Sequence, residues 1–235
     1  LDEDSKTAYV YQAQALDNAG AARFAAEFAA AHGVEFPDAY YYDDLVIYAN
    51  HSSGDFLNVT LHDGTWEYSF GRDHTPVFDA PASGVTEDML REELDKFGFS
   101  IPADAAFTLA PYPAVLSADL LPTQGGFLHG TLTCELRTQG DGQSTLSQLE
   151  NRITTLAPVR EEPILSPAQA LAALQLGKSF EGAWFAQSVQ QIEVRFSTLD
   201  YLSDSKGIYQ PVYRFELSLA GQAGGITDAV DLVPA

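Results

Sequence analysis

Apolar and polar residues alternate along several short segments of the chain, and this alternation predicts strands that bury one face. The clearest case is KGIYQPVYRFELSL at residues 206–219, in which Tyr209, Tyr213 and Leu217 fall on the same face. The dipeptide Asp63-Gly64 predicts a tight hairpin between two other alternating segments. The same pattern predicts strands over residues 8–16, 44–50, 56–64, 65–71, 126–136 and 191–202.

Other segments have apolar residues at spacings of three and four, which predicts helices with one buried stripe. Gly33 follows an alanine-rich segment and is suited to end a helix in the left-handed conformation. In ILSPAQALAALQLG, Ser166 is a helix cap, Pro167 suits the first helical position, and Gln169 completes a capping box. We therefore predict helices over residues 17–33, 86–98 and 166–177.

Residues 144–156 fit two structures. Leu146, Leu149 and Ile153 have helical spacing, but the segment follows a Gly-Asp-Gly turn after a strand, which favours a hairpin partner with a bulge. We favour a strand for part of it and leave the helix open. A change of apolar phase near residues 197–198 predicts a second bulge.

Pro211 interrupts an otherwise regular strand pattern. It has no backbone N–H, so its nitrogen cannot face a partner strand. We predict either a sheet edge at this residue or pairing with residues 190–202 that tightens only after Val212.

These elements predict an α+β protein made of two similar units, each an antiparallel sheet with one or two helices packed on one face. A segment rich in proline and alanine starts near residue 101, and we place the joint there. The predicted domains are residues 1–103 and residues 104–235.

Charge limits the classes of partner. The chain has 12 Lys and Arg residues against 33 Asp and Glu residues, a formal net charge of −21. Such a surface repels nucleic acids and anionic lipid headgroups, so we predict no nucleic-acid partner. No apolar run approaches the roughly 18–20 residues of a membrane-spanning helix. The chain begins with LDEDSK and has one methionine, Met89, so we expect a processed chain with its membrane tether upstream of Leu1.

The candidates for chemistry are few. His51, His62 and His74 fall on predicted strand ends and turns, where they and neighbouring aspartates could converge on zinc. Their spacing matches no metal signature, so we predict no metal and no cofactor, and keep the three histidines as candidates. Cys134 lies at an apolar strand position and is predicted to be buried and inert. The chain has no Gly-x-Ser-x-Gly motif, and we predict no catalytic residues.

The segment DAYYYDDL, residues 38–45, has three consecutive tyrosines between acidic residues. On a strand or a loop at least one of them is exposed, and exposed tyrosines are enriched in surfaces that bind proteins or stack on sugars. The alternative is that two belong to the core and one lies at its rim. We select Tyr40, Tyr41 and Tyr42 as the candidate partner-binding residues.

The second half of the chain, residues 126–235, resembles the YycH/YycI-type extracytoplasmic regulatory proteins of Firmicutes and, more loosely, PepSY-like modules. That pattern joins a Ser-Pro-x-x-Ala helix to a hairpin whose second strand reads Tyr-x-x-Pro-Val-Tyr-x-Phe. The matching residues are Ser166, Pro167, Ala170, Tyr209, Pro211, Val212, Tyr213 and Phe215, although Tyr209 is one residue closer to the proline than in that pattern. The resemblance implies no catalytic residues.

The resemblance implies an exported, extracytoplasmic protein anchored at the bacterial cell surface. We expect a non-enzymatic lipoprotein that acts as a protein-interaction or regulatory module, with a sensor kinase or an envelope enzyme as its partner. One alternative is a metal- or sugar-dependent hydrolase or ligand-binding protein built near His51, His62 and His74. A second alternative is a PepSY-type protease inhibitor.

Overall fold

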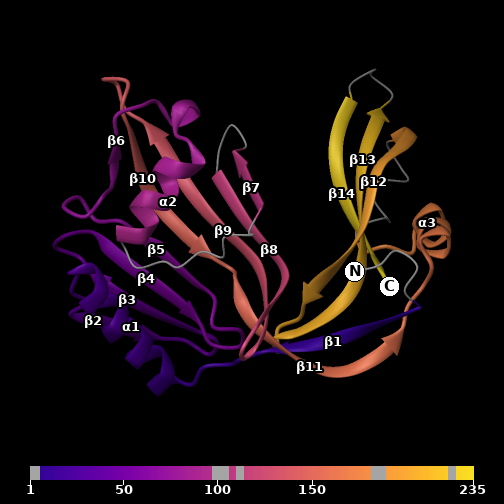
Figure 1. Ribbon diagram of the computed structural model, residues 1–235, viewed down its shortest axis with the longest axis horizontal. Helices are drawn as coiled ribbons and strands as arrows, with labels where there is room; N and C mark the ends of the chain where they lie inside the picture. Colours follow the sequence, from indigo (N-terminus) through magenta and orange to yellow (C-terminus); the bar gives the residue numbers. More distant parts are fainter. Residues whose placement is uncertain (1–5, 97–105, 110–113, 181–188, 222–225) are drawn as a thin grey trace. The chain divides into compact units, whose positions relative to one another are not determined.

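The computed structural model describes residues 6–96, 106–109, 114–180, 189–221 and 226–235 (Figure 1). The chain forms two compact units. The larger unit is Ala13–Ala157, and the smaller unit combines Leu1–Gln12 with Pro158–Ala235. The predicted boundary between residues 103 and 104 falls inside the larger unit, on residues outside the described part of the chain.

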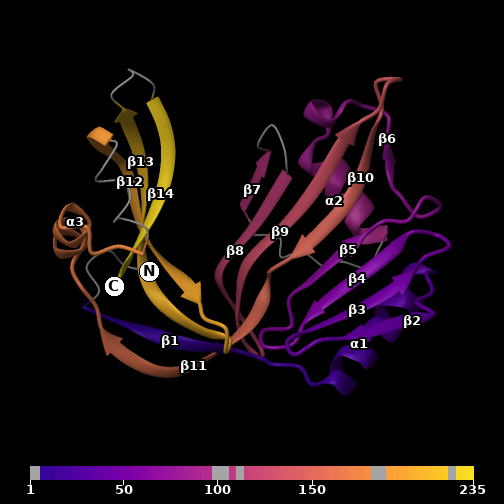
Figure 2. The same ribbon diagram turned by 180° about the vertical axis from the view of Figure 1, so that it is seen from behind.

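The larger unit contains a long series of antiparallel strands in the order β11-β9-β10-β5-β4-β3-β2, although it includes β11 only as far as Ala157. β7 pairs with β8, β8 pairs with β9, and the short β6 pairs with β10. Figure 2 shows β2 as the outermost strand beside β3, β4 and β5. The strand bounds are β2 Asp38–Tyr41, β3 Leu45–Asn50, β4 Asp55–Thr60, β5 Trp66–Ser69, β6 Val77–Phe78, β7 Ala106–Leu109, β8 Ala114–Thr123, β9 Gly126–Thr138, β10 Ser144–Asn151 and β11 Thr154–Pro163.

Two helices of the larger unit cover one face of these strands. In α1, Asn18–His32, the Asp17 side chain accepts a hydrogen bond from the Gly20 N–H, and Gly33 ends the helix with φ 65°. In α2, Glu87–Lys96, the Thr86 hydroxyl accepts a hydrogen bond from the Met89 N–H. A short 3₁₀ helix, η1, spans Ala82–Gly84. The three predicted helices are thus confirmed where the chain is described, the third being α3 below.

The core of the larger unit lies between these helices and the inward face of the strands. Phe28 of α1 contacts the rings of Trp66 and Tyr68, with centroids 5.6 and 4.9 Å apart. Leu90 and Leu94 of α2 are wholly buried in the same cluster. The alternating residues of β4 and β5 therefore bury one face of each strand in this core and leave the other face partly exposed, as the sequence pattern predicted.

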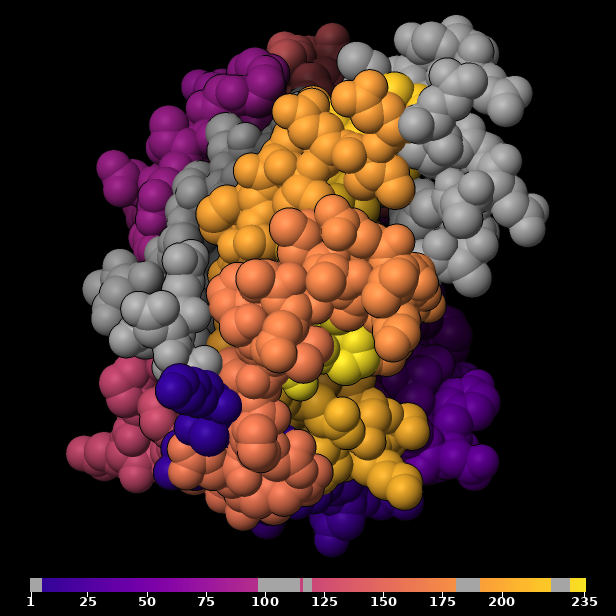
Figure 3. All heavy atoms as spheres, turned by 90° about the vertical axis from the view of Figure 1, so that its right-hand side faces the viewer, coloured from indigo at the N-terminus to yellow at the C-terminus, as the bar shows by residue number. Residues whose placement is uncertain are grey.

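The smaller unit is built around β13, Ile208–Gly221, with β12, Val189–Ser203, along one side. Along its other side β13 pairs first with β1, Thr7–Ala13, and then with β14, Ile226–Pro234. The helix α3, Pro167–Gln175, begins with the predicted capping box at Ser166. Its Ala170 packs on Tyr213, Phe215 and neighbouring core residues. Figure 3 views this unit from the side of α3, with atoms of the strands visible beside the helix.

Pro211 lies where β13 exchanges one neighbour for another. Its pairing with β1 ends at Tyr209, and its pairing with β14 starts at Val212. The hydrogen bond from the Asp204 N–H to the Ile208 carbonyl makes these two residues a hydrogen-bonded pair. It thereby fixes which of the following pairs of β12 and β13 are hydrogen-bonded and which are not. This alternation turns the Pro211 nitrogen away from β12. The predicted edge at Pro211 is confirmed on the side of β13 that faces away from β12. The predicted delay in pairing with β12 is wrong, because that pairing runs from Tyr209 to Gly221.

The predicted α+β architecture of two similar units is wrong. Within the described residues the protein is mainly a large antiparallel sheet, and its three α-helices are short. The prediction treated each half as a self-contained sheet, but strand partners come from distant parts of the chain, and Tyr11 pairs with Tyr209. β7 and β8 lie within the proline- and alanine-rich segment, and residues 101–105, where the joint was placed, lie outside the described residues.

Residues 144–151 and 154–156 are strand, which settles the alternative that the sequence left open. β10 and the start of β11 cover these residues, and the register shifts between Leu146 and Gln148 as a bulge would require. The second predicted bulge is also present, between Val194 and Phe196, slightly before the expected position. Among the described residues, no helix combines the length and apolar character that crossing a membrane requires.

Candidate functional site

The three consecutive tyrosines lie at an open edge of the sheet in the larger unit. Tyr40 and Tyr41 belong to β2, whose partner is β3, and Tyr42 starts the turn between these strands. Their exposed fractions are 44%, 56% and 58%. All three are therefore at the surface, and neither of the two side chains that the alternative placed in the core is buried. We call Tyr40, Tyr41, Tyr42 and the rest of β2 the tyrosine edge.

The tyrosine edge lies in a part of the chain without cationic side chains. Residues 24–71 contain no Lys or Arg and eight Asp or Glu residues. Asp38 begins β2, and Asp43 and Asp44 form the turn that follows Tyr42. No Lys or Arg of the same segment therefore offsets the negative charge at this edge.

His51 is the first of the three candidate histidines, and it lies beside the tyrosine edge. Its Nε2 is 3.2 Å from the Tyr40 hydroxyl. The His51 ring also packs edge-on against Phe56 at a centroid distance of 5.5 Å. The structure therefore brings together two residues selected from the sequence, and the imidazole restrains the orientation of Tyr40.

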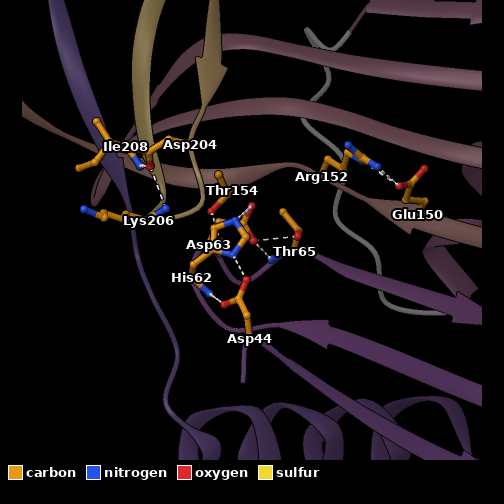
Figure 4. Close-up of polar contacts among 10 residues, drawn as sticks. All are labelled: Asp44, His62, Asp63, Thr65, Glu150, Arg152, Thr154, Asp204, Lys206 and Ile208. Atoms are coloured by element: carbon orange, nitrogen blue, oxygen red, sulfur yellow. Dashed lines mark hydrogen bonds and ion pairs between the residues drawn. The ribbon is translucent and has the colours of Figure 1, made fainter. Parts of the chain in front are cut away.

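His62 is held between two carboxylates (Figure 4). Its Nδ1 is 2.5 Å from Asp44 Oδ2, and its Nε2 is 3.4 Å from Asp63 Oδ2. The backbone N–H of His62 donates to Asp44 Oδ1 at 3.0 Å. Asp63 in turn accepts hydrogen bonds from the backbone N–H and hydroxyl of Thr65 at 3.0 and 2.8 Å, and its carbonyl accepts one from the Thr154 hydroxyl at 2.7 Å. This network ties the β2–β3 turn to the β4–β5 turn.

His74 contacts a buried carboxylate in a different part of the unit. Asp55 has no exposed surface, and its carboxylate accepts hydrogen bonds from the Tyr68 hydroxyl at 2.5 Å, the Gly71 N–H at 2.7 Å and His74 Nδ1 at 2.8 Å. Burial raises the pKa of Asp55, but the hydrogen bonds outweigh it and hold the pKa below its usual value. Burial and the neighbouring Asp55 carboxylate raise the pKa of Tyr68.

The three histidines do not share one centre. His51 contacts Tyr40, His62 contacts Asp44 and Asp63, and His74 contacts Asp55. Both ring nitrogens of His62 face carboxylates, and neither His51 nor His74 belongs to that contact group. No group of three or more His, Cys, Asp or Glu side chains in the described part of the chain is arranged to hold a metal ion.

The sequence reasoning did not select Asp55, although it has the most complete set of polar contacts of these residues. Its donors come from Tyr68, Gly71 and His74, which lie 13 to 19 residues further along the chain. An ideal Cβ on Gly71 would lie 2.5 Å from the Asp55 carboxylate, so this approach requires a glycine. The glycine after a strand was a weak signal that the backbone there approaches another group.

Cys134 is wholly buried on β9, and burial raises the pKa of its thiol to about 12. We expect the thiol of the folded protein to react with a disulfide reagent at pH 8 at least about 1,000 times more slowly than in the urea-unfolded chain, because burial suppresses both the thiolate and access to it. Absorbance of the released reagent measures both rates. Rapid labelling of a protein that retains its folded circular dichroism spectrum would contradict this expectation.

Comparisons with known proteins add no family to this description. No protein-family model matches the chain, and no curated protein matches it. The chain is similar to the crystal structure of an uncharacterized protein from Eubacterium rectale ATCC 33656, with 11% sequence identity and a TM-score of 0.48 over 98% of this chain and 85% of that chain. A similarity this distant supports no inference, so the resemblance to YycH/YycI-type proteins stays a prediction.

Proposed function

We propose that this protein is a non-enzymatic binding module that contacts a protein partner through the tyrosine edge. The observation that carries the proposal is the exposure of Tyr40, Tyr41 and Tyr42 side by side, at 44%, 56% and 58%. Tyrosine supplies a large apolar ring and a polar hydroxyl while losing little conformational entropy, which is why it is enriched in binding surfaces.

The form of the edge supports a macromolecular partner over a small ligand. Small-molecule sites are concave and enclose most of the ligand. The tyrosine edge instead lies along the outermost strand, and all four residues of β2 are exposed. Such a surface offers contact area along a line, which suits an extended partner segment.

Location and regulatory role form a second part of this proposal. We propose an extracytoplasmic protein at the bacterial cell surface that regulates a sensor kinase or an envelope enzyme. The segments SPAQA and YQPVYRF support this part through their resemblance to YycH/YycI-type proteins. The binding role of the tyrosine edge is independent of that resemblance, because it rests on exposure and charge.

The binding role can be tested with three labelled peptides of about eight residues that alternate valine with lysine, serine or glutamate. We expect at least one of them to bind, and the triple substitution Tyr40→Ser, Tyr41→Ser and Tyr42→Ser to weaken binding about tenfold or more, because interface tyrosines contribute disproportionately to affinity. Fluorescence anisotropy gives the dissociation constants.

The matched control is Tyr9→Ser, which changes another exposed tyrosine, 46% exposed, on β1 of the smaller unit. It should leave the dissociation constants within about twofold, the usual size of a change outside the contact surface. The proposal would be overturned if none of the three peptides binds, or if the triple variant binds all of them as well as the wild type does.

A further inference from the structure

The edge of β2 presents backbone groups as well as tyrosines. The Tyr42 N–H donates to the Leu45 carbonyl at 2.8 Å, which makes this pair the first hydrogen-bonded pair of the β2–β3 hairpin. Hydrogen-bonded and non-bonded pairs alternate along an antiparallel ladder. With Tyr40 opposite Ile47 and Tyr41 opposite Val46, the alternation assigns the N–H and C=O groups of Tyr40 to β3 and those of Ala39 and Tyr41 to the open side.

The tyrosines stand on both faces of this edge. Successive side chains of a strand point to opposite faces, so Tyr40 and Tyr41 flank the open backbone groups between them. Tyr41 shares its face with the buried Val46, whereas Tyr40 lies on the other face with His51 beside it. A strand added to β2 would thus meet one ring on each of its own faces, which is the cross-strand contact that stabilises pairing.

The acidic residues around β2 favour a particular kind of partner strand at its open side. Asp38 lies at one end of the strand, and Asp43 and Asp44 lie at the other. A second copy of this chain paired antiparallel along the same edge would bring Asp38 of each copy toward Asp43 and Asp44 of the other, and like charges across a strand pair are destabilising. A segment with Lys or Arg side chains has the complementary charge.

Resting on the proposed function, we propose that the partner contributes a cationic, extended segment that pairs with β2 as an additional strand. Backbone hydrogen bonds to Ala39 and Tyr41 provide the pairing, and the rings of Tyr40 and Tyr41 pack against the segment. The Asp side chains at the two ends of β2 select Lys and Arg over acidic residues. This is recognition by strand addition, in which the main chain gives affinity and the side chains give specificity.

The substitution Ala39→Pro tests the backbone part of the proposal. It removes an N–H from the open side of β2 and keeps all three tyrosines and the pairing of Tyr40 with β3. Proline is tolerated on edge strands for this reason. The matched control is Ala39→Thr, which keeps the N–H and favours strand structure.

We expect Ala39→Pro to weaken binding of the valine-lysine peptide about tenfold or more, and Ala39→Thr to change it about twofold or less. The valine-lysine peptide should also bind more tightly than the serine or glutamate peptide, and added salt should reduce this preference. If the thermal unfolding midpoint shows that Ala39→Pro disturbs the fold, the wild type is titrated with the same peptide N-methylated at alternate residues, in both registers. At least one register should lose binding.

The possible results separate the two proposals. If the tyrosine triple variant loses binding while Ala39→Pro and both N-methylated peptides bind like their controls, the tyrosine edge is a contact surface and strand addition is wrong. If the serine or glutamate peptide is preferred, the cationic partner is wrong. Strand addition is also wrong if no lysine-containing peptide binds. The proposed function itself is wrong if no peptide binds, or if the peptides bind equally well without the three tyrosines.

Discussion

Replacing Gly130 by alanine is expected to destabilise the larger unit by about 4 kcal/mol or more. Gly130 lies on β9 with φ 125°, a conformation that side chains rarely adopt. An ideal Cβ at this position would lie 2.0 Å from the carbonyl oxygen of Arg152. The obstacle is backbone, which cannot rotate away as a flexible side chain can, so the chain between β10 and β11 would have to move. Urea unfolding followed by circular dichroism measures the loss.

Gly140→Ala is the matched control, because an ideal Cβ there has no atom within 4 Å. We expect the free energy of unfolding of this variant to lie within about 0.5 kcal/mol of that of the wild type. Gly126→Ala should lose about as much stability as Gly130→Ala. Gly126 has φ 144°, and an ideal Cβ there would lie 2.2 Å from the Leu156 carbonyl oxygen. A Gly130→Ala protein as stable as Gly140→Ala would show that β9 and the residues around Arg152 do not approach each other as described.

The second large effect is expected at Asp55. Substitution by alanine should lower the free energy of unfolding by about 3–5 kcal/mol, because it leaves the Tyr68 hydroxyl and the Gly71 N–H buried without their acceptor. The exposed Asp73 provides a control in the neighbouring loop, and Asp73→Ala makes the same change in charge. This control should lie within about 0.5 kcal/mol of the wild type. The free energy of unfolding in urea measures both variants.

The pH dependence of stability provides a separate test of Asp55. The folded pKa of this carboxyl is below its ordinary value of about 3.9, so the unfolded chain takes up the proton first as the pH falls. The stabilisation by Asp55 is therefore complete above the unfolded pKa and is lost as the pH falls through the folded pKa. The advantage of the wild type over Asp55→Asn should shrink over this acidic range, and an advantage that grows as the pH falls would contradict the lowered pKa.

The helices were predictable because their signals are local. Asp17 and Gly33 bound α1 within one short segment, and Ser166 with Gln169 specifies the start of α3 over four residues. These residues contact the backbone of their own helix, so the sequence alone contains the required information. The individual strands with clear alternation were predictable for the same reason.

The order of strands in the sheet was not predictable, because paired strands lie far apart in the sequence. Alternation around Tyr209 indicates a strand but does not indicate that Tyr11 lies opposite. β7, β8 and β14 were missed altogether, since their segments do not alternate clearly, and prolines in the region of β7 and β8 favour a loop reading. The prediction of two similar α+β units failed through these missing strands and through the partner choice.

The candidate site divides in the same way. The exposure of Tyr40, Tyr41 and Tyr42 was foreseen in part, because three consecutive residues of a strand cannot all face the core. The contact of Tyr40 with His51 depends on the β2–β3 hairpin and the turn that follows it, which the sequence did not resolve. Asp55 was missed because an aspartate beginning a strand has no local mark of burial, and its three donors are gathered only by folding.

The pairing of β1 with β13 has a consequence for synthesis on the ribosome. Thr7–Ala13 is translated well before its partner around Tyr209. Among the described residues, the core of the larger unit and the side chains packed against it come from residues 16–153, so this core can consolidate while the smaller unit is still being translated. β1 therefore cannot pair with β13 until the region around Tyr209 has been translated.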